Sequence, residues 1–117
     1  MKEILADLRE IPGILGCMMT TTDGMVVASN LGEGLDENAA AALVSSLLAG
    51  ITELITYCGG DHMRSLILRA SRGKILVNDL GNSYLVVVTD GHLDLEQGLI
   101  DIQSAAQHLQ KLGQMVV

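Results

Sequence analysis

The chain has 117 residues, a length that suits one domain, and we expect that domain to span residues 1–117. Hydrophobic residues make up 49% of the sequence, enough for a core without disulfides or metal, but Trp and Phe are absent, so this core must be aliphatic. The formal net charge of -7 argues against nucleic acid or an anionic membrane as the main partner.

The first half of the chain predicts a short helix, a hairpin and a long helix. Pro12-Gly13 ends the first helix. Asp23-Gly24 separates two apolar runs, and this dipeptide readily takes the positive φ of a tight hairpin. Asp36 is the expected N-cap of the long helix, which stops at Gly59-Gly60. We expect these elements at residues 2–11, 14–20, 25–29 and 35–60.

The second half predicts three strands and a final helix, at residues 62–70, 74–80, 84–89 and 94–112. Turns at residues 71–73 and 81–82 join the strands. Asp94 followed by Gln97 is a capping-box pattern for the last helix, and Ile100 lies on its polar side. The apolar side of this helix is formed by Leu95, Leu99, Ile102, Ala105, Ala106, Leu109 and Leu112.

The predicted order is therefore αββαβββα. Short hairpin connections make the five-stranded sheet antiparallel, which places the chain in the α+β class of α/β proteins. Strands such as Tyr84–Thr89 are apolar on consecutive positions, so we expect helices on both faces of the sheet.

The long helix has two unlike sides when its residues are placed at about 100° intervals. A broad apolar stripe is expected to face the sheet: Leu43, Val44, Leu47, Leu48, Ile51, Leu54 and Ile55. The opposite arc is small and nearly uncharged: Ala42, Ser45, Ser46, Ala49, Thr52, Glu53 and Thr56. Because exposed helix faces are usually charged, we interpret this small arc as a second packing surface, most simply against another copy. An alanine-rich surface that is merely tolerated in water is the alternative.

Membrane insertion is not expected, because the longest charge-free run, Asn38–Thr52, has 15 residues and a bilayer needs roughly 20. The chain opens on a charged amphipathic stretch without the pattern of a signal peptide. Cys17 and Cys58 lie in apolar segments and are expected to be buried free thiols of a reducing compartment. These features predict a cytoplasmic protein.

No pattern predicts a catalytic, metal or cofactor site, and we expect none. Residues Thr20–Gly24 lack the Lys and the glycine spacing of a phosphate-binding loop. Cys58 and His62 are four apart but have no second ligand pair, which does not indicate zinc. Four basic residues, Arg64, Arg69, Arg72 and Lys74, predict either a positive edge for an acidic partner or solvated strand and turn charges.

The segment IPGILGCMMTTTDGMVVAS (residues 11–29), within the αββαβββα order, resembles the Roadblock domain, whose family includes dynein light chains and bacterial partners of Ras-like GTPases. The likeness continues through the alanine-rich central helix and LILRASRGKILVNDLGNSYLVVVTD (residues 66–90) to a closing helix entered through LEQGL (residues 95–99). It covers nearly the whole chain.

The resemblance implies a homodimer that pairs its third strand antiparallel with its mate and packs the two central helices side by side. The interface would then comprise the small helical arc named above and a strand segment: Met63, Arg64, Ser65, Leu66, Ile67, Leu68 and Arg69. A heterodimer with a related domain is the alternative.

The resemblance also implies a non-enzymatic regulator or scaffold that binds a small Ras-like GTPase and modulates its nucleotide cycle or location. We place the GTPase contact at Ala39, Leu43, Glu53 and Tyr57. The alternative function is a small-molecule sensor or a general protein-interaction module of profilin-like fold. A sensor would need a cavity lined by groups such as Tyr84, His92 or Arg64.

Overall fold

The helices and strands follow the predicted αββαβββα order in a computed structural model. It describes residues 2–32, 34–60, 62–71, 73–91 and 95–115, with the backbone alone for 95–97, 99 and 112–115. The elements are α1 (Lys2–Arg9), β1 (Ile14–Thr21), β2 (Val26–Asn30), α2 (Glu37–Tyr57), β3 (Ser65–Arg69), β4 (Gly73–Asp79), β5 (Ser83–Asp90) and α3 (Leu95–Met115). The third strand is thus shorter than the predicted 62–70.

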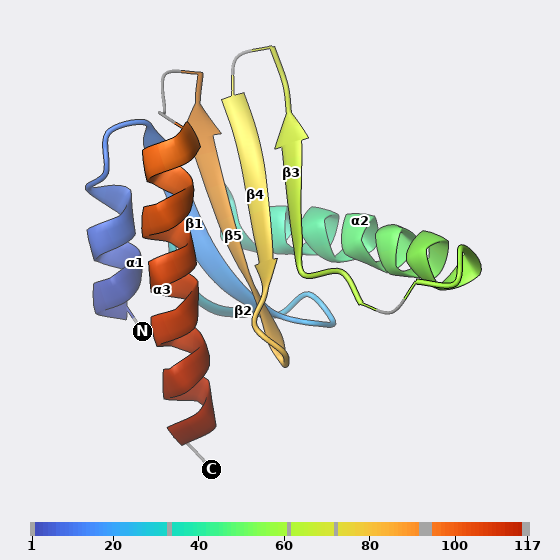
Figure 1. The fold of residues 1–117 in the computed structure, drawn as a ribbon. Coiled ribbons are helices and arrows are strands. Elements are labelled where there is room, and N and C mark those ends of the chain that lie inside the picture. The colour runs from blue at the N-terminus through green and yellow to red at the C-terminus, as the bar shows by residue number, and fades with distance from the viewer. Residues whose placement is uncertain (1, 33, 61, 72, 92–94, 116–117) are drawn as a thin grey trace.

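The five strands form one antiparallel sheet in the order β2-β1-β5-β4-β3. Helices α1 and α3 cover one face, while α2 passes across the opposite face (Figure 1). Cys17 and Met19 of β1 join the core on the α1/α3 side, and Met18 between them joins the core on the α2 side. Because neighbouring residues of a strand point to opposite faces, an apolar run here is buried on both, as predicted.

Helix α2 begins and ends at the predicted signals. The Asp36 carboxylate accepts hydrogen bonds from the backbone N–H groups of Asn38 (2.9 Å) and Ala39 (3.3 Å), which confirms Asp36 as N-cap. At the other end, Gly59 has φ +82° and its N–H donates to the Thr56 carbonyl at 3.0 Å. A left-handed residue just past the last turn is the usual helix stop, and glycine takes it without steric cost.

The core on the α1/α3 side is the larger of the two. Among the described residues it includes Leu5 and Leu8 of α1, Leu85 and Val87 of β5, and the apolar side of α3. On α3 the predicted positions Ile102, Ala105, Ala106 and Leu109 are buried, and Ile100 is 60% exposed. The predicted cap at Asp94 and the side chains of Gln97, Leu95, Leu99 and Leu112 lie outside the described residues.

The two cysteines differ, although both were expected to be buried. Cys17 is fully buried in β1, where its thiol donates to the Leu5 carbonyl at 3.2 Å. Cys58 is exposed, so the prediction for this residue is wrong. The reason is its position at the C-cap of α2, on the part of the helix that extends past the sheet (Figure 1).

Candidate functional site

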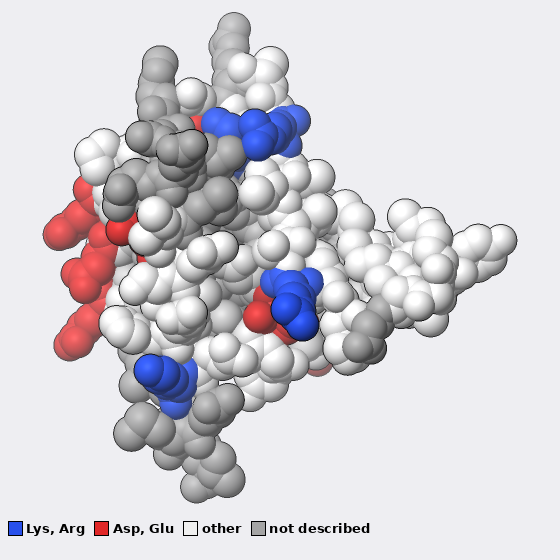
Figure 2. Space-filling view, viewed as in Figure 1, with Lys and Arg blue, Asp and Glu red and all other residues white. Residues whose placement is uncertain are grey.

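The C-terminal part of α2 extends beyond β3, the last strand on that side of the sheet (Figure 1). Figure 2 shows one face of this projecting end, and no Lys, Arg, Asp or Glu lies on that face. Of the residues of α2, only Ala41 and Leu48 are buried. A helix with so little of its surface covered and so little charge on it requires a physical explanation.

The apolar stripe predicted to face the sheet is only partly buried. Ala41 and Leu48 form the line of closest contact with the sheet, so α2 is rotated relative to the prediction. Val44, Ile51 and Ile55 are half-buried beside this line. The prediction is wrong for three leucines, which are exposed: Leu43 (72%), Leu47 (38%) and Leu54 (59%). We call these three residues the leucine flank.

The predicted small arc lies on the other side of the buried line. Ser45 is half-buried against the β1–β2 turn, where a Cβ on Gly24 would lie 2.8 Å from the Ser45 Cβ. The other members are exposed: Ala42, Ser46, Ala49, Thr52, Glu53 and Thr56. The residues predicted to contact a GTPase are exposed as well: Ala39, Leu43, Glu53 and Tyr57.

A row of apolar side chains on the α2 face of the sheet is only partly covered by α2, because Leu68 is exposed and Ile75 and Val88 are half-buried. Strand register aligns Leu68 of β3 with Ile75 of β4 and Val88 of β5. The preceding row, from Leu66 through Val77 to Val86, packs in the cluster that contains Leu48. Hollows of about 380 and 280 Å³ lie along the Leu68–Ile75–Val88 row, and Leu43 lines the smaller one. The leucine flank therefore reaches the partly open row of the sheet at Leu43.

Strand β3 is one edge of the described sheet and pairs with β4. Of the strand residues predicted at an interface, Met63, Leu66 and Ile67 are half-buried; Arg64, Ser65, Leu68 and Arg69 are exposed. Arg69 pairs in register with Lys74, and basic side chains gather at this end of the hairpin in Figure 2. Arg72, the fourth residue of the predicted basic edge, lies outside the described residues. An edge strand leaves backbone groups open to another strand.

A groove of about 680 Å³ follows the side of α2 that carries the small arc. It is lined by both tyrosines of the chain, Tyr57 from the end of α2 and Tyr84 from the start of β5, and by Glu53. We call it the tyrosine groove. Burial, with a smaller effect of Asp79, raises the pKa of Tyr84. Of the groups predicted to line a sensor cavity, Tyr84 does line this groove, Arg64 does not, and His92 lies outside the described residues.

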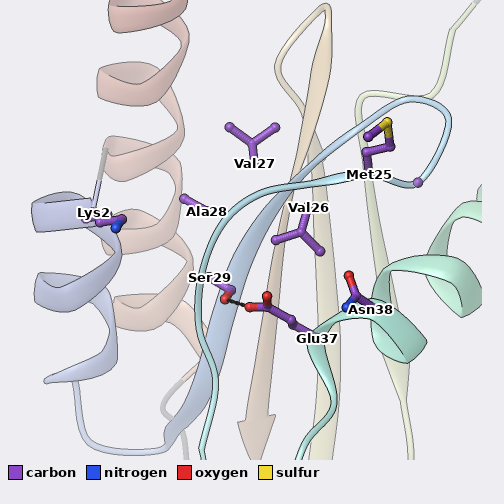
Figure 3. A pocket seen from close by; sticks show the side chains of 9 residues that line it. Lys2, Met25, Val26, Val27, Ala28, Ser29, Glu37 and Asn38 are labelled. Carbon is purple, nitrogen blue, oxygen red and sulfur yellow. Dashed lines mark hydrogen bonds between the residues drawn. The ribbon is translucent and has the colours of Figure 1, made fainter.

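A further groove of about 590 Å³ runs along β2, the opposite edge of the sheet. Figure 3 shows Lys2 of α1 on one side of this strand and Glu37 and Asn38 of α2 on the other. The Ser29 hydroxyl donates a hydrogen bond to the Glu37 carboxylate and so ties the start of α2 to β2. The charged groups of this groove, Lys2 and Glu37, have opposite signs, so its charge selects no particular ligand.

The described residues do not assemble a catalytic constellation. No group of three or more His, Cys, Asp or Glu among them could hold a metal ion. Burial raises the pKa of the Cys17 thiol to about 11, partly offset by Arg9, so this cysteine stays protonated at neutral pH. The structure instead presents surfaces for contact.

By length and composition alone α2 also resembles a membrane-crossing helix, although Ala41 and Leu48 pack on the sheet.

Comparison with known proteins identifies the same architecture. The family model of the Roadblock/LC7 domain matches residues 1–89. An uncharacterized protein of Methanocaldococcus jannaschii, MJ1340, is 28% identical over 109 residues, 93% of this chain and 96% of that protein.

Two solved structures extend the comparison to the fold. MglB of Myxococcus xanthus superposes with a TM-score of 0.93 at 16% identity, covering 98% of this chain and 95% of that one. Profilin IB of Acanthamoeba castellanii superposes with a TM-score of 0.69 at 12% identity, covering 96% of this chain and 98% of that one. At these identities the likeness concerns the fold alone, and it confirms the expected Roadblock and profilin-like layout.

Proposed function

Because the chain belongs to the Roadblock/LC7 domain family, we propose that it is a cytoplasmic, homodimeric, non-enzymatic protein that binds a small Ras-like GTPase and regulates or localises it. The observation that supports the dimer is the combination of an overhanging α2, an exposed leucine flank and a partly covered row of the sheet. The GTPase is inferred from the family resemblance and from the exposed outer surface of α2.

A two-fold axis at β3 brings these three features together. Antiparallel pairing of β3 with its mate, centred at Ile67, sets Leu68 of one protomer opposite Leu66 of the partner subunit. Since α2 crosses its own sheet near Leu66, the partner's α2 then lies at the level of Leu68. Its overhang covers the Leu68–Ile75–Val88 row, and the two leucine flanks meet.

This geometry changes the part of α2 that we propose for the helix contact. The prediction placed the contact on the small arc. In the structure Leu43 of the leucine flank borders the partly covered row, and the small arc borders the tyrosine groove. Full burial of an exposed leucine contributes about 2 kcal/mol. The leucine flank therefore offers the stronger driving force for association, while the strand pairing sets its register.

The outer surface of α2 stays available for a further protein in such a dimer. Ala39 and Tyr57 lie on it, between the leucine flank and the small arc, and Glu53 belongs to the adjoining small arc. Leu43, the fourth residue predicted to contact a GTPase, belongs to the leucine flank and is assigned to the dimer contact instead. The two copies of this surface would lie side by side across the two-fold axis, which gives a GTPase one broad site formed by both protomers. The regulatory effect would then follow from favouring one conformation of the GTPase switch loops over another.

Titration calorimetry with purified Ras-like GTPases of the same organism, each loaded with GDP and with a non-hydrolysable GTP analogue, tests this function. We expect binding that depends on the nucleotide. Ala39→Arg places a long charged side chain on the outer surface of α2 and should weaken binding at least about tenfold. Gln103→Arg, which adds the same charge at an exposed position of α3, is the control. Absence of binding by every such GTPase in both states would contradict the proposal.

A bilayer is the competing cover for the leucine flank, because α2 is apolar enough for one. Sedimentation with vesicles of neutral and of anionic lipid distinguishes the two. We expect the protein to stay in the supernatant with both, since the charge of -7 opposes anionic surfaces and the partner's α2 hides the leucines. Co-sedimentation with neutral vesicles would favour the bilayer.

A further inference from the structure

We propose that the tyrosine groove binds an arginine side chain presented by a protein partner. The groove lies on the side of α2 away from the leucine flank, so the proposed dimer leaves it open. Its volume of about 680 Å³ is large enough to admit an arginine side chain. Its lining comes from three separate segments: α2, the start of β5 at Tyr84, and Thr22 in the β1–β2 turn.

The charge of the groove selects a cation. Glu53 is the one charged residue among the described residues that line it. No described residue forms a hydrogen bond or an ion pair with its carboxylate. The whole chain carries a net charge of -7, which adds to the attraction for a positive group. An unpaired carboxylate beside a hollow is a ready acceptor for charge-assisted hydrogen bonds.

The rest of the lining selects arginine among cations. Tyr57 and Tyr84 are the only Tyr, Phe or Trp side chains of the chain, and both line this groove. A guanidinium stacks on an aromatic face and can at the same time donate to a carboxylate in a bidentate manner. Leu48 and Ala49 supply an apolar wall for the methylene groups of the arginine stem. The Thr56 hydroxyl donates to the Thr52 carbonyl at 2.9 Å and so does not compete for Glu53.

The first test uses the tyrosines as reporters. Because the chain has no Trp or Phe, its aromatic proton NMR spectrum contains only two tyrosines and three histidines. We expect N-acetyl-arginine methylamide to shift the ring signals of both Tyr57 and Tyr84 saturably at millimolar concentration. The citrulline analogue, an uncharged isostere, should leave them unchanged, and so should arginine added to the Glu53→Gln variant. Glu10→Gln, at an exposed position just after α1, is the control variant and should respond as the unmodified protein does.

The opposite results would overturn the inference. They are ring signals that do not move with the arginine probe, equal shifts with the citrulline analogue, or shifts that persist in Glu53→Gln. Sedimentation of Glu53→Gln should show the same association state as the unmodified protein. This check excludes an effect that arises through a lost dimer.

The second test concerns the partner and rests on the proposed function, since a GTPase is the protein expected to present the arginine. Glu53→Gln should lower the affinity for the GTPase, measured by calorimetry, about tenfold. Raised salt should reduce the difference in affinity between the variant and the unmodified protein. If the GTPase binds the unmodified protein and the Glu53→Gln variant with equal affinity, arginine docking in this groove is overturned, while the proposed GTPase binding stands. If no GTPase binds the unmodified protein, the proposed function fails, and the NMR titration alone decides the inference.

Discussion

The two faces of the sheet are covered to very different degrees. On one face, α1 and α3 enclose a core in which Leu5, Leu85 and Ile102 are at most 1% exposed. On the other, α2 buries Ala41 and Leu48 but leaves Leu43 72% exposed. The difference teaches that the α1/α3 side is completed within the chain, while the α2 side leaves large apolar side chains exposed.

The largest expected effect is a loss of folding stability from a substitution on the α1/α3 side of the sheet, which we call the closed side. Leu85→Ala, in the centre of the sheet and fully buried, should lower the free energy of unfolding by about 3–4 kcal/mol. The reason is the lost transfer energy together with the cavity that remains. Urea unfolding at a fixed protein concentration measures it. A loss below about 1 kcal/mol would show that the closed side is less tightly packed than the structure indicates.

On the α2 side the expected effect is on association rather than on folding. Leu54→Glu, on the projecting part of α2, should weaken the dimer at least about a hundredfold, because it would bury an unpaired charge. Ile100→Glu is the matched control, since Ile100 is 60% exposed on α3 and Leu54 is 59% exposed. Light scattering should show a monomer for the first variant and an unchanged dimer for the second. Equal behaviour of both variants would place the contact elsewhere.

A smaller effect is expected at the N-cap of α2. Helix α2 has few buried contacts, so its cap should matter for the whole domain. Asp36→Ala removes the acceptor for the N–H groups of Asn38 and Ala39 and should cost about 1 kcal/mol in thermal or urea unfolding. Asp36→Asn keeps a capping acceptor and should retain most of the stability. Equal losses in the two variants would argue against capping by this side chain.

The smallest effect contrasts the two thiols. At pH 8 a thiol reagent should modify exposed Cys58 rapidly and spare buried Cys17 until the protein unfolds. Burial raises the pKa of Cys17 to about 11 from an ordinary value of 9.0. Below pH 9 the Cys17 thiol is protonated in both the folded and the unfolded protein. Between pH 9 and 11 the unfolded protein binds fewer protons than the folded one, so the free energy of unfolding should fall as pH rises. Cys17→Ala should remove that part of the pH dependence.

Much of the fold could be predicted because the signals are local. Asp23-Gly24, Asp36 and Gly59 each act on the backbone within a few residues, and the structure confirms the turn, the cap and the stop. The order of elements then leaves few ways to build an antiparallel sheet. The family resemblance added the expected fold, which the superposed structures confirm.

The orientation of α2 could not be predicted, for a physical reason. A helical wheel assumes that the widest apolar arc faces the chain's own core, but α2 divides its apolar residues between the sheet and the exposed leucine flank. Ala41, a small residue, is therefore buried while Leu43 is exposed. Cys58 was wrongly expected to be buried for a related reason, since the overhang of α2 is a property of the tertiary structure. The tyrosine groove was likewise missed, because Tyr57 and Tyr84 come together only in space.

Sedimentation equilibrium of the unmodified protein across a range of micromolar concentrations tests the central claim most directly. The account predicts a species of twice the 12.4 kDa chain mass, held together where the leucine flank of one copy meets that of the other. A single species of 12.4 kDa at every concentration would contradict it.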